Sequence, residues 1–238
     1  MKKIFLLIVL SVLGYASFSY AGLFDDIFKS FGGSFKEETS ENTIIAGLKE
    51  ALSIGTQNAV TIISKKDGYF RNEGIKIIMP EKIRMVADVL KKVGFQSQVD
   101  DFLLSMNRAA EKAAPKAASF FVDALKEMSF IDARNILNGE DMAATDYFKE
   151  KTADKIYNAF KPIVSSSMNT VGVTRSYKEM MSKYESIPFI EKKSLDLDHY
   201  VTTMALDGLF FMVGQEEKKI RTDPGARITE LLKEVFDR

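Results

Sequence analysis

Apolar side chains recur every three or four residues through most of this chain, and that spacing constrains its fold more than any other feature. From Thr43 to about Ser64, isoleucine, leucine and alanine form one stripe along a predicted helix. Further helical patterns follow over 80–94, 95–128, 143–168, 197–220 and 226–236. The sequence therefore predicts an all-α fold, a single multi-helix domain of about seven or more helices over 43–238.

Only the segment 69–79 departs from this helical pattern. Isoleucines cluster there before Pro80 and after a predicted turn at 66–68, so at most a short hairpin or an isolated strand is expected. Pro80 is expected to open the next helix at its first turn. Pro115 and Pro162 each lie inside a helical pattern. We expect a kink or a break at both, because proline lacks the N–H that a helix interior uses.

The first 21 residues have the composition of a secretory signal peptide. Two lysines precede an apolar run over 4–13, and Ser19 and Ala21 supply the small residues of a cleavage site. The run is shorter than the roughly 20 residues that a membrane-spanning helix needs. We therefore expect cleavage after Ala21, export to the periplasm and no transmembrane segment after cleavage.

Residues 22–42 form an N-terminal segment with two interpretations. Apolar residues from Leu23 to Phe31 fall at helical spacing, which suits a short amphipathic helix on a membrane or in a partner's groove. The same stripe suits a flap or linker packed on its own domain. We favour the second, because the polar face carries two aspartates and only one lysine, whereas membrane-surface helices usually carry lysines and arginines there.

Charge and cysteine content exclude several classes of protein. Without the two lysines of the signal peptide, 31 basic residues remain against 33 acidic ones, which argues against a nucleic-acid partner. The chain contains no cysteine, so disulfides, thiolate metal sites and an acylated-cysteine anchor are excluded. The one histidine, His199, cannot form a two-histidine metal motif. We expect no metal site and no cofactor.

Asn107, Arg108 and Glu111 form the first candidate ligand-binding group. At about 100° per residue, Asp100, Asn107 and Glu111 share one side of a predicted helix, with Arg108 beside them. Carboxylates with an arginine suit a cation or a polar ligand. However, an apolar stripe covers the opposite side of the helix, so we favour the solvated face of an ordinary amphipathic helix. Asn107, at the edge of that face, is the residue best placed for burial.

Thr145 and Asp146 form a second group at a predicted helix start, just after Glu140 and Asp141. We favour a capping role, in which Thr145 or Asp141 accepts hydrogen bonds from the first N–H groups of the helix. A ligand or ion bound at this helix start is the alternative. The spacing of the acids does not match a calcium loop.

Asp207 is the third candidate, because apolar residues surround it on nearly every side of the helix over 197–220. A buried carboxylate needs a cationic or hydrogen-bonding partner, or its pKa rises. We therefore expect Asp207 to be buried in an ion pair, either structural or functional, and its replacement by asparagine to destabilise the protein by about 3–5 kcal/mol.

Five short runs occur in a fixed order along the chain: MNRAAEKAAP from Met106, ILNG from Ile136, ATDYF from Ala144, VGVT from Val171 and ALDGLF from Ala205. With them, the region from Thr43 onward resembles a bacterial group of exported proteins, domain-of-unknown-function family 4197. The resemblance implies an extracytoplasmic protein with one undivided domain, and it supplies no catalytic residues. Many relatives carry an acylated cysteine after the signal peptide, which this chain lacks.

Two classes of function follow. The first is a cell-envelope binding or interaction protein, whose partner is an apolar or lipid-like small molecule or another envelope protein. No catalytic or cofactor motif is present, and phenylalanine and methionine are abundant, as in adaptable apolar pockets. The alternative is an extracytoplasmic enzyme that uses carboxylates and arginine. The residues considered for either site are Asn107, Arg108, Glu111, Thr145, Asp146, Arg175 and Asp207.

Overall fold

The computed structural model describes residues 40–92, 94–170 and 196–223. All regular secondary structure in these ranges is helical, which confirms the all-α class. The elements are α2 (Ser40–Ser64), α3 (Glu81–Lys92), α4 (Gln96–Ala113), the 3₁₀ turn η1 (Ala114–Lys116), α5 (Ala117–Glu127), α6 (Phe130–Leu137), α7 (Ala143–Thr170) and α9 (Leu197–Thr222). The expected cleavage site, the segment 22–39, Arg175 and the last predicted helix lie outside the described residues.

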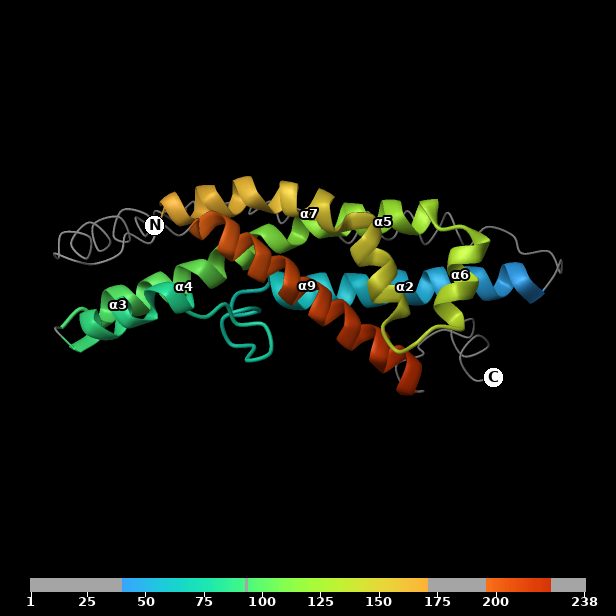
Figure 1. Ribbon diagram of the computed structural model, residues 1–238. Helices are drawn as coiled ribbons and strands as arrows, with labels where there is room; N and C mark the ends of the chain where they lie inside the picture. Colours follow the sequence, from blue (N-terminus) through green and yellow to red (C-terminus); the bar gives the residue numbers. More distant parts are fainter. Residues whose placement is uncertain (1–39, 93, 171–195, 224–238) are drawn as a thin grey trace, which may run out of the picture.

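The helices form an elongated bundle that α9 crosses obliquely (Figure 1). α9 packs against α7 on one side and α2 on the other, and α4 also packs against α7. Aromatic rings pack in the core. The ring centroid of Phe121 lies 5.1 Å from that of Phe148 and 6.2 Å from that of Phe210, both in edge-to-face contacts. α3 packs chiefly against α4, and together they form a hairpin at one end of the bundle.

The two interior prolines behave differently. Pro115 lies in η1, so the expected break between α4 and α5 is confirmed. Pro162 does not break its helix, because α7 continues to Thr170. Phe160 and Val164 on either side of this proline are fully buried. Their packing offsets the lost backbone hydrogen bond, which costs about 3 kcal/mol.

The segment 65–80 between α2 and α3 contains turns and irregular backbone, with no strand. The predicted turn at 66–68 is present, with Asp67 at a φ of 70° and the Gly68 amide bonded to the Lys65 carbonyl at 2.9 Å. Ile75 and Ile77 are buried. The residues that suggested a strand therefore anchor an irregular loop in the core.

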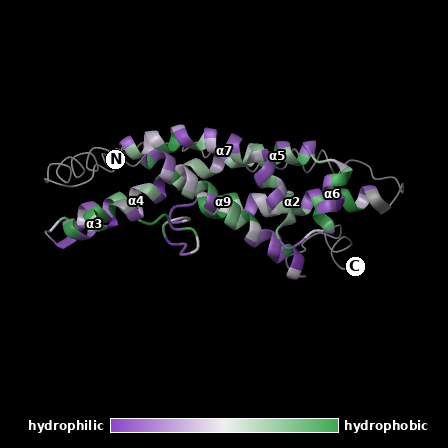
Figure 2. Cartoon of the chain, viewed as in Figure 1, coloured by the Kyte–Doolittle hydropathy of each residue, from purple (hydrophilic) through white to green (hydrophobic). Residues whose placement is uncertain are grey.

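Hydrophobic and hydrophilic residues are mixed along each described helix (Figure 2). Among the described residues, no helix is both long enough and apolar enough to cross a lipid bilayer.

Candidate functional site

Asn107 on α4 holds the loop 65–80 through the backbone of Ile77. Its side-chain oxygen accepts from the Ile77 amide at 2.9 Å, and its side-chain nitrogen donates to the Ile77 carbonyl at 2.9 Å. The same nitrogen also donates to the Leu103 carbonyl at 2.9 Å. Asn107 is fully buried. The Asn107 amide therefore pairs with both backbone groups of Ile77, as a neighbouring strand would. The expected burial of Asn107 is confirmed.

Glu111, one turn further along α4, holds the start of the same loop. One carboxylate oxygen accepts from the amides of Tyr69 and Phe70 at 3.1 and 3.2 Å. The other accepts from Arg108 at 2.6 Å, and Arg108 also donates to Asp67 at 2.6 Å. Glu111 is only 5% exposed, so the expectation of a solvated face is wrong for this residue. Periodicity could not show this, because the covering loop is irregular.

Tyr69 connects this loop to α9 on its other side. Its ring is fully buried, and its hydroxyl donates to the Ala205 carbonyl at 2.7 Å. Gly208 lies so close that a Cβ there would be 2.7 Å from the Tyr69 ring. Burial raises the pKa of the Tyr69 hydroxyl far above its usual range, so it stays protonated as a donor. Asn107, Glu111 and Tyr69 therefore form a loop clamp between α4 and α9.

Glu217 on α9 caps the start of α7. Its carboxylate accepts from the amides of Ala144 and Thr145 at 3.0 and 2.8 Å, and from the Thr145 hydroxyl at 2.7 Å. A capping role for the buried Thr145 was expected, but its hydroxyl donates to Glu217 instead of accepting from its own helix. Asp141 and Asp146 are exposed. The capping carboxylate thus comes from a distant helix, which sequence reasoning missed.

Arg221 extends this cap to α6. Its guanidinium donates to Glu217 at 2.8 and 3.0 Å and to the Ile136 carbonyl near the end of α6 at 2.9 Å. The side chains of Arg221 and Glu217 are only 15% and 4% exposed. One ion pair therefore fixes the end of α6 and the start of α7 relative to α9.

Asp207 is exposed, so the expectation of a buried ion pair is wrong. It lies between Thr203 and Phe211 on the side of α9 that faces solvent, and even Phe211 is 44% exposed there. The expected destabilisation by Asp207→Asn has no basis without burial. His199 is also exposed, with its Nδ1 atom 2.7 Å from the Tyr157 hydroxyl.

The sequence candidates do not converge on one cleft. Asn107, Arg108 and Glu111 belong to the loop clamp, whereas Thr145 belongs to the cap at Glu217. Asp146 and Asp207 are exposed, and Arg175 lies outside the described residues. The enzyme alternative required these groups to converge in one cleft, and the described ones do not, because Asn107, Glu111 and Thr145 hold separate parts of the backbone.

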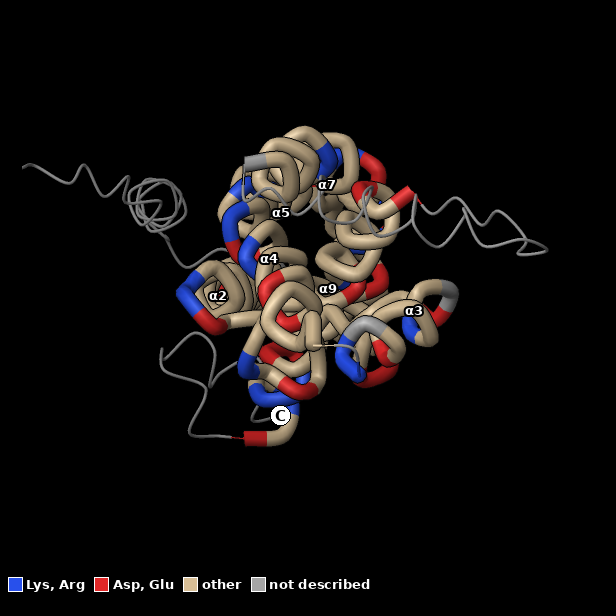
Figure 3. Tube along the Cα trace, turned by 90° about the vertical axis from the view of Figure 1, so that its left-hand side faces the viewer, with Lys and Arg blue, Asp and Glu red and all other residues tan. Residues whose placement is uncertain are grey.

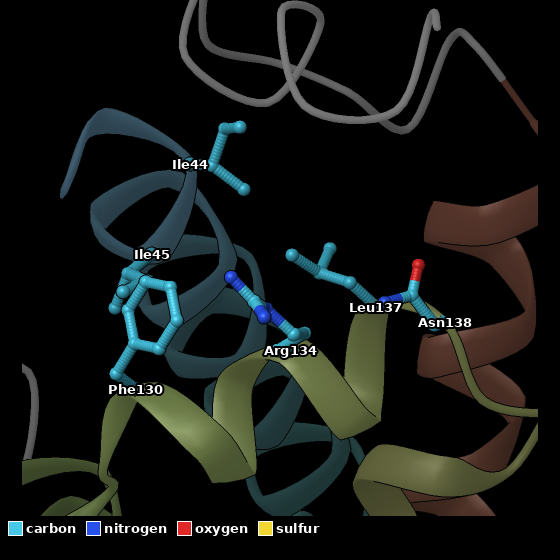
Figure 4. Close-up of a pocket in the computed structure, with 6 residues that line it drawn as sticks. All are labelled: Ile44, Ile45, Phe130, Arg134, Leu137 and Asn138. Atoms are coloured by element: carbon cyan, nitrogen blue, oxygen red, sulfur yellow. The ribbon is translucent and has the colours of Figure 1, made fainter. Parts of the chain in front are cut away.

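A pocket of about 190 Å³ lies between α2 and α6 (Figure 4). Its walls are mostly apolar, and none of the residues chosen from the sequence lines it. The lining residues are Ile44 and Ile45 from α2, Phe130, Arg134 and Leu137 from α6, and Asn138 at the end of α6. The α6 residues recur at helical spacing, but their spacing alone does not reveal that they face α2.

The α6 wall of this pocket is fixed at both ends. At its start, Ser129 and Asp132 form a reciprocal capping box, and hydrogen bonds from Ser129 lower the pKa of Asp132. At its end, Arg221 holds the Ile136 carbonyl. The Arg134 guanidinium lies 4.7 Å from the centre of the Phe130 ring, a cation–π contact that orients the charge. The pocket therefore combines apolar walls with one oriented cation.

Comparison with protein families matches residues 38–237 to the family described as Protein of unknown function (DUF4197). Comparison with curated proteins and with solved structures gives no significant match.

Proposed function

This chain belongs to the DUF4197 family, and we propose that it is an exported cell-envelope protein that binds a small amphiphilic anion between α2 and α6. The observation that supports ligand binding is the pocket itself, in which Arg134 adjoins the apolar side chains of Ile44, Ile45 and Leu137. Such a combination suits a molecule with an apolar group and a negatively charged head.

The volume of the pocket limits the size of the apolar group. About 190 Å³ is slightly more than the roughly 150 Å³ of an apolar cavity that binds benzene. It is less than the roughly 300–1,000 Å³ of pockets that enclose drug-sized ligands. The pocket therefore accepts a single ring or a short branched chain, whereas a longer acyl chain would extend into solvent.

Arg134 and Asn138 determine the preferred head group. A guanidinium pairs with carboxylate or phosphate through charge-assisted hydrogen bonds, and the Asn138 amide offers further donors. Burial of a ring with about 100 Å² of apolar surface contributes about 2.5 kcal/mol. A charged hydrogen bond adds about 1.5–3 kcal/mol, but association costs about 4 kcal/mol or more in lost translational and rotational freedom, so we expect only weak binding, in the millimolar range or above.

The test of binding uses benzoate and benzyl alcohol, which share a ring and differ in charge. Titrations followed by NMR should show tighter binding of benzoate to the wild type. Arg134→Met should weaken benzoate binding at least about tenfold, since one charge-assisted hydrogen bond is lost, and should leave benzyl alcohol binding nearly unchanged. Arg71→Met is the matched control, because the Arg71 side chain is 79% exposed and does not line the pocket.

A second variant tests the location of the ligand. Leu137→Trp should fill the pocket and abolish binding of both compounds while the protein remains folded by circular dichroism. Binding of benzoate that survives both Arg134→Met and Leu137→Trp would refute the proposed site.

Export is supported by residues 1–21 alone, with their lysines, apolar run and small residues at the cleavage site. We expect the protein from a periplasmic extract to begin at Gly22, as measured by intact mass and N-terminal sequencing. Recovery of the full-length chain from the cytoplasm would contradict export. This outcome is independent of the binding measurements, which concern residues of the helical domain.

A further inference from the structure

α3 presents an outer face that no other described element covers. This α3 outer face comprises Glu81, Arg84, Met85, Asp88, Val89 and Lys92, all of them exposed. Met85 is 72% exposed and Val89 is 55% exposed, the former being the most exposed large apolar residue among the described ones. The opposite side of α3 buries Ile83, Val86 and Ala87.

We propose that the α3 outer face pairs with the same face of a second copy of this chain, with the two helices antiparallel about a two-fold axis. Such a contact requires a surface that is complementary to itself. The charges on α3 meet this requirement, because Glu81 lies at its start and Lys92 at its end. Figure 3 shows acidic and basic residues side by side on α3.

The axial positions of the charged residues match in the antiparallel pair. With a rise of about 1.5 Å per residue, Glu81 and Lys92 each lie about 8 Å from the midpoint between residues 86 and 87. A two-fold axis through that midpoint places Glu81 at the same height as the partner's Lys92. By symmetry, the second such ion pair forms at the other end of the contact.

The remaining residues of the face pair in the same arrangement. Arg84 and Asp88 lie on one flank of α3. Measured along the helix axis, Arg84 lies within about 2 Å of the partner's Asp88, and Asp88 lies equally close to the partner's Arg84. Met85 and Val89 lie toward the other flank, where Met85 meets the partner's Val89. Each charge therefore faces an opposite charge, and the exposed apolar residues form one shared cluster beside them.

A lipid surface fits this face less well. Helices that lie on membranes carry lysine and arginine around a continuous apolar stripe, whereas Glu81 and Asp88 interrupt the apolar side chains on α3. The same acids are needed in the paired arrangement, where they meet Lys92 and Arg84 of the partner subunit.

The length of α3 sets the strength of the association. Its 12 residues extend about 18 Å, so one helix pair buries less than the roughly 1,200 Å² typical of stable complexes. We therefore expect a weak dimer whose population increases with protein concentration.

The test is sedimentation equilibrium of the untagged protein from micromolar to millimolar concentration, with charge-reversed variants. Glu81→Lys and Lys92→Glu should each raise the dimer dissociation constant by at least about tenfold, because each places like charges together twice. The double variant Glu81→Lys/Lys92→Glu should restore the wild-type value. Ile131→Lys on α6 is the control and should change nothing, although Ile131 is 69% exposed.

Three results would overturn the proposal. The first is a protein that stays monomeric at millimolar concentration. The second is a dimer that both single charge reversals leave unchanged, since another surface would then hold it. The third is a wild-type protein that sediments with phosphatidylglycerol–phosphatidylethanolamine vesicles while Met85→Asp does not, which would assign the face to a membrane.

Discussion

The carboxylate of Glu217 accepts a hydrogen bond from the hydroxyl of Thr145 at 2.7 Å, although 72 residues separate them in the chain. The same carboxylate accepts from two amides at the start of α7 and pairs with Arg221. A negative charge at this position also interacts favourably with the helix dipole. Glu217 and Arg221, paired on α9, thus link the start of α7 and the end of α6 to α9.

We predict that Glu217→Ala strongly destabilises the fold. Removing one partner of a buried ion pair leaves Arg221 and the α7 amides uncompensated, which costs about 3–5 kcal/mol. Urea unfolding followed by circular dichroism measures the loss. Glu150→Ala is the control, with a side chain 76% exposed and an expected change within about 0.5 kcal/mol. An equal loss of unfolding free energy in Glu217→Ala and Glu150→Ala would contradict a stabilising role for Glu217.

We predict that Asn107→Leu loosens the loop 65–80. The substitution leaves the buried N–H and C=O of Ile77 without their partner, at about 1–3 kcal/mol for each group. Hydrogen exchange at the Ile77 amide should accelerate together with the loss of stability. Asp207→Asn, at an exposed position, should change stability by no more than about 0.5 kcal/mol. A protected Ile77 amide in the Asn107 variant would contradict the clamp.

We predict an acid-dependent contribution to stability from Asp67. The hydrogen bond from Arg108 is the largest cause that lowers the pKa of this carboxyl group. Because the pKa of Asp67 is lower in the folded state, its ionised form stabilises the fold above the unfolded-state pKa of about 3.9. This stabilisation is lost as the pH falls through the folded-state pKa.

Thermal unfolding of the wild type and Asp67→Asn at a series of pH values measures this contribution. The wild type should be the more stable above about pH 5, and the difference should shrink as the pH falls below about 3.9 and through the lowered folded-state pKa of Asp67. Other titrating groups are common to both proteins and cancel in the comparison. A difference that is constant over this range would exclude the ion pair as its cause.

We predict that Gly208→Ala destabilises the contact between α9 and the loop clamp. The added Cβ would lie 2.7 Å from the Tyr69 ring and 3.1 Å from the Ile75 Cβ, and both neighbours are buried. Overpacking of this kind costs about 1–3 kcal/mol. Gly214→Ala should cost less, because its Cβ would meet the mobile end of Met142. Chemical denaturation of both variants gives the comparison, and the opposite order would contradict it.

Local patterns predicted most of the helices, because helical periodicity and helix-ending residues act within a few turns. The short helix α6 (Phe130–Leu137) was not predicted. The helix over 43–64, the break at Pro115 and the end of α3 near Gly94 all follow from neighbouring residues. Of the kink or break expected at Pro162, the break is absent, because packing on distant helices outweighs the local cost of proline there.

The candidate site was much harder to predict. Asn107 and Asp207 both lie on helices with apolar stripes, and sequence alone cannot tell which polar side chain a distant segment will cover. The loop 65–80 covers Asn107 and Glu111, whereas nothing among the described residues buries Asp207. The pocket at Arg134 was missed for the same reason, since its opposite wall comes from α2.

The sequence by itself determined the helical class, the positions of most helices and the family membership implied by its short motifs, and its first 21 residues predict a signal peptide. Only the tertiary structure decided which polar groups are buried, which carboxylate caps α7 and which face of α6 lines a pocket. The physical reason is range. A helix is specified by contacts three or four residues apart, whereas the burial of Glu111 and Glu217 depends on partners brought together from 41 to 73 residues away.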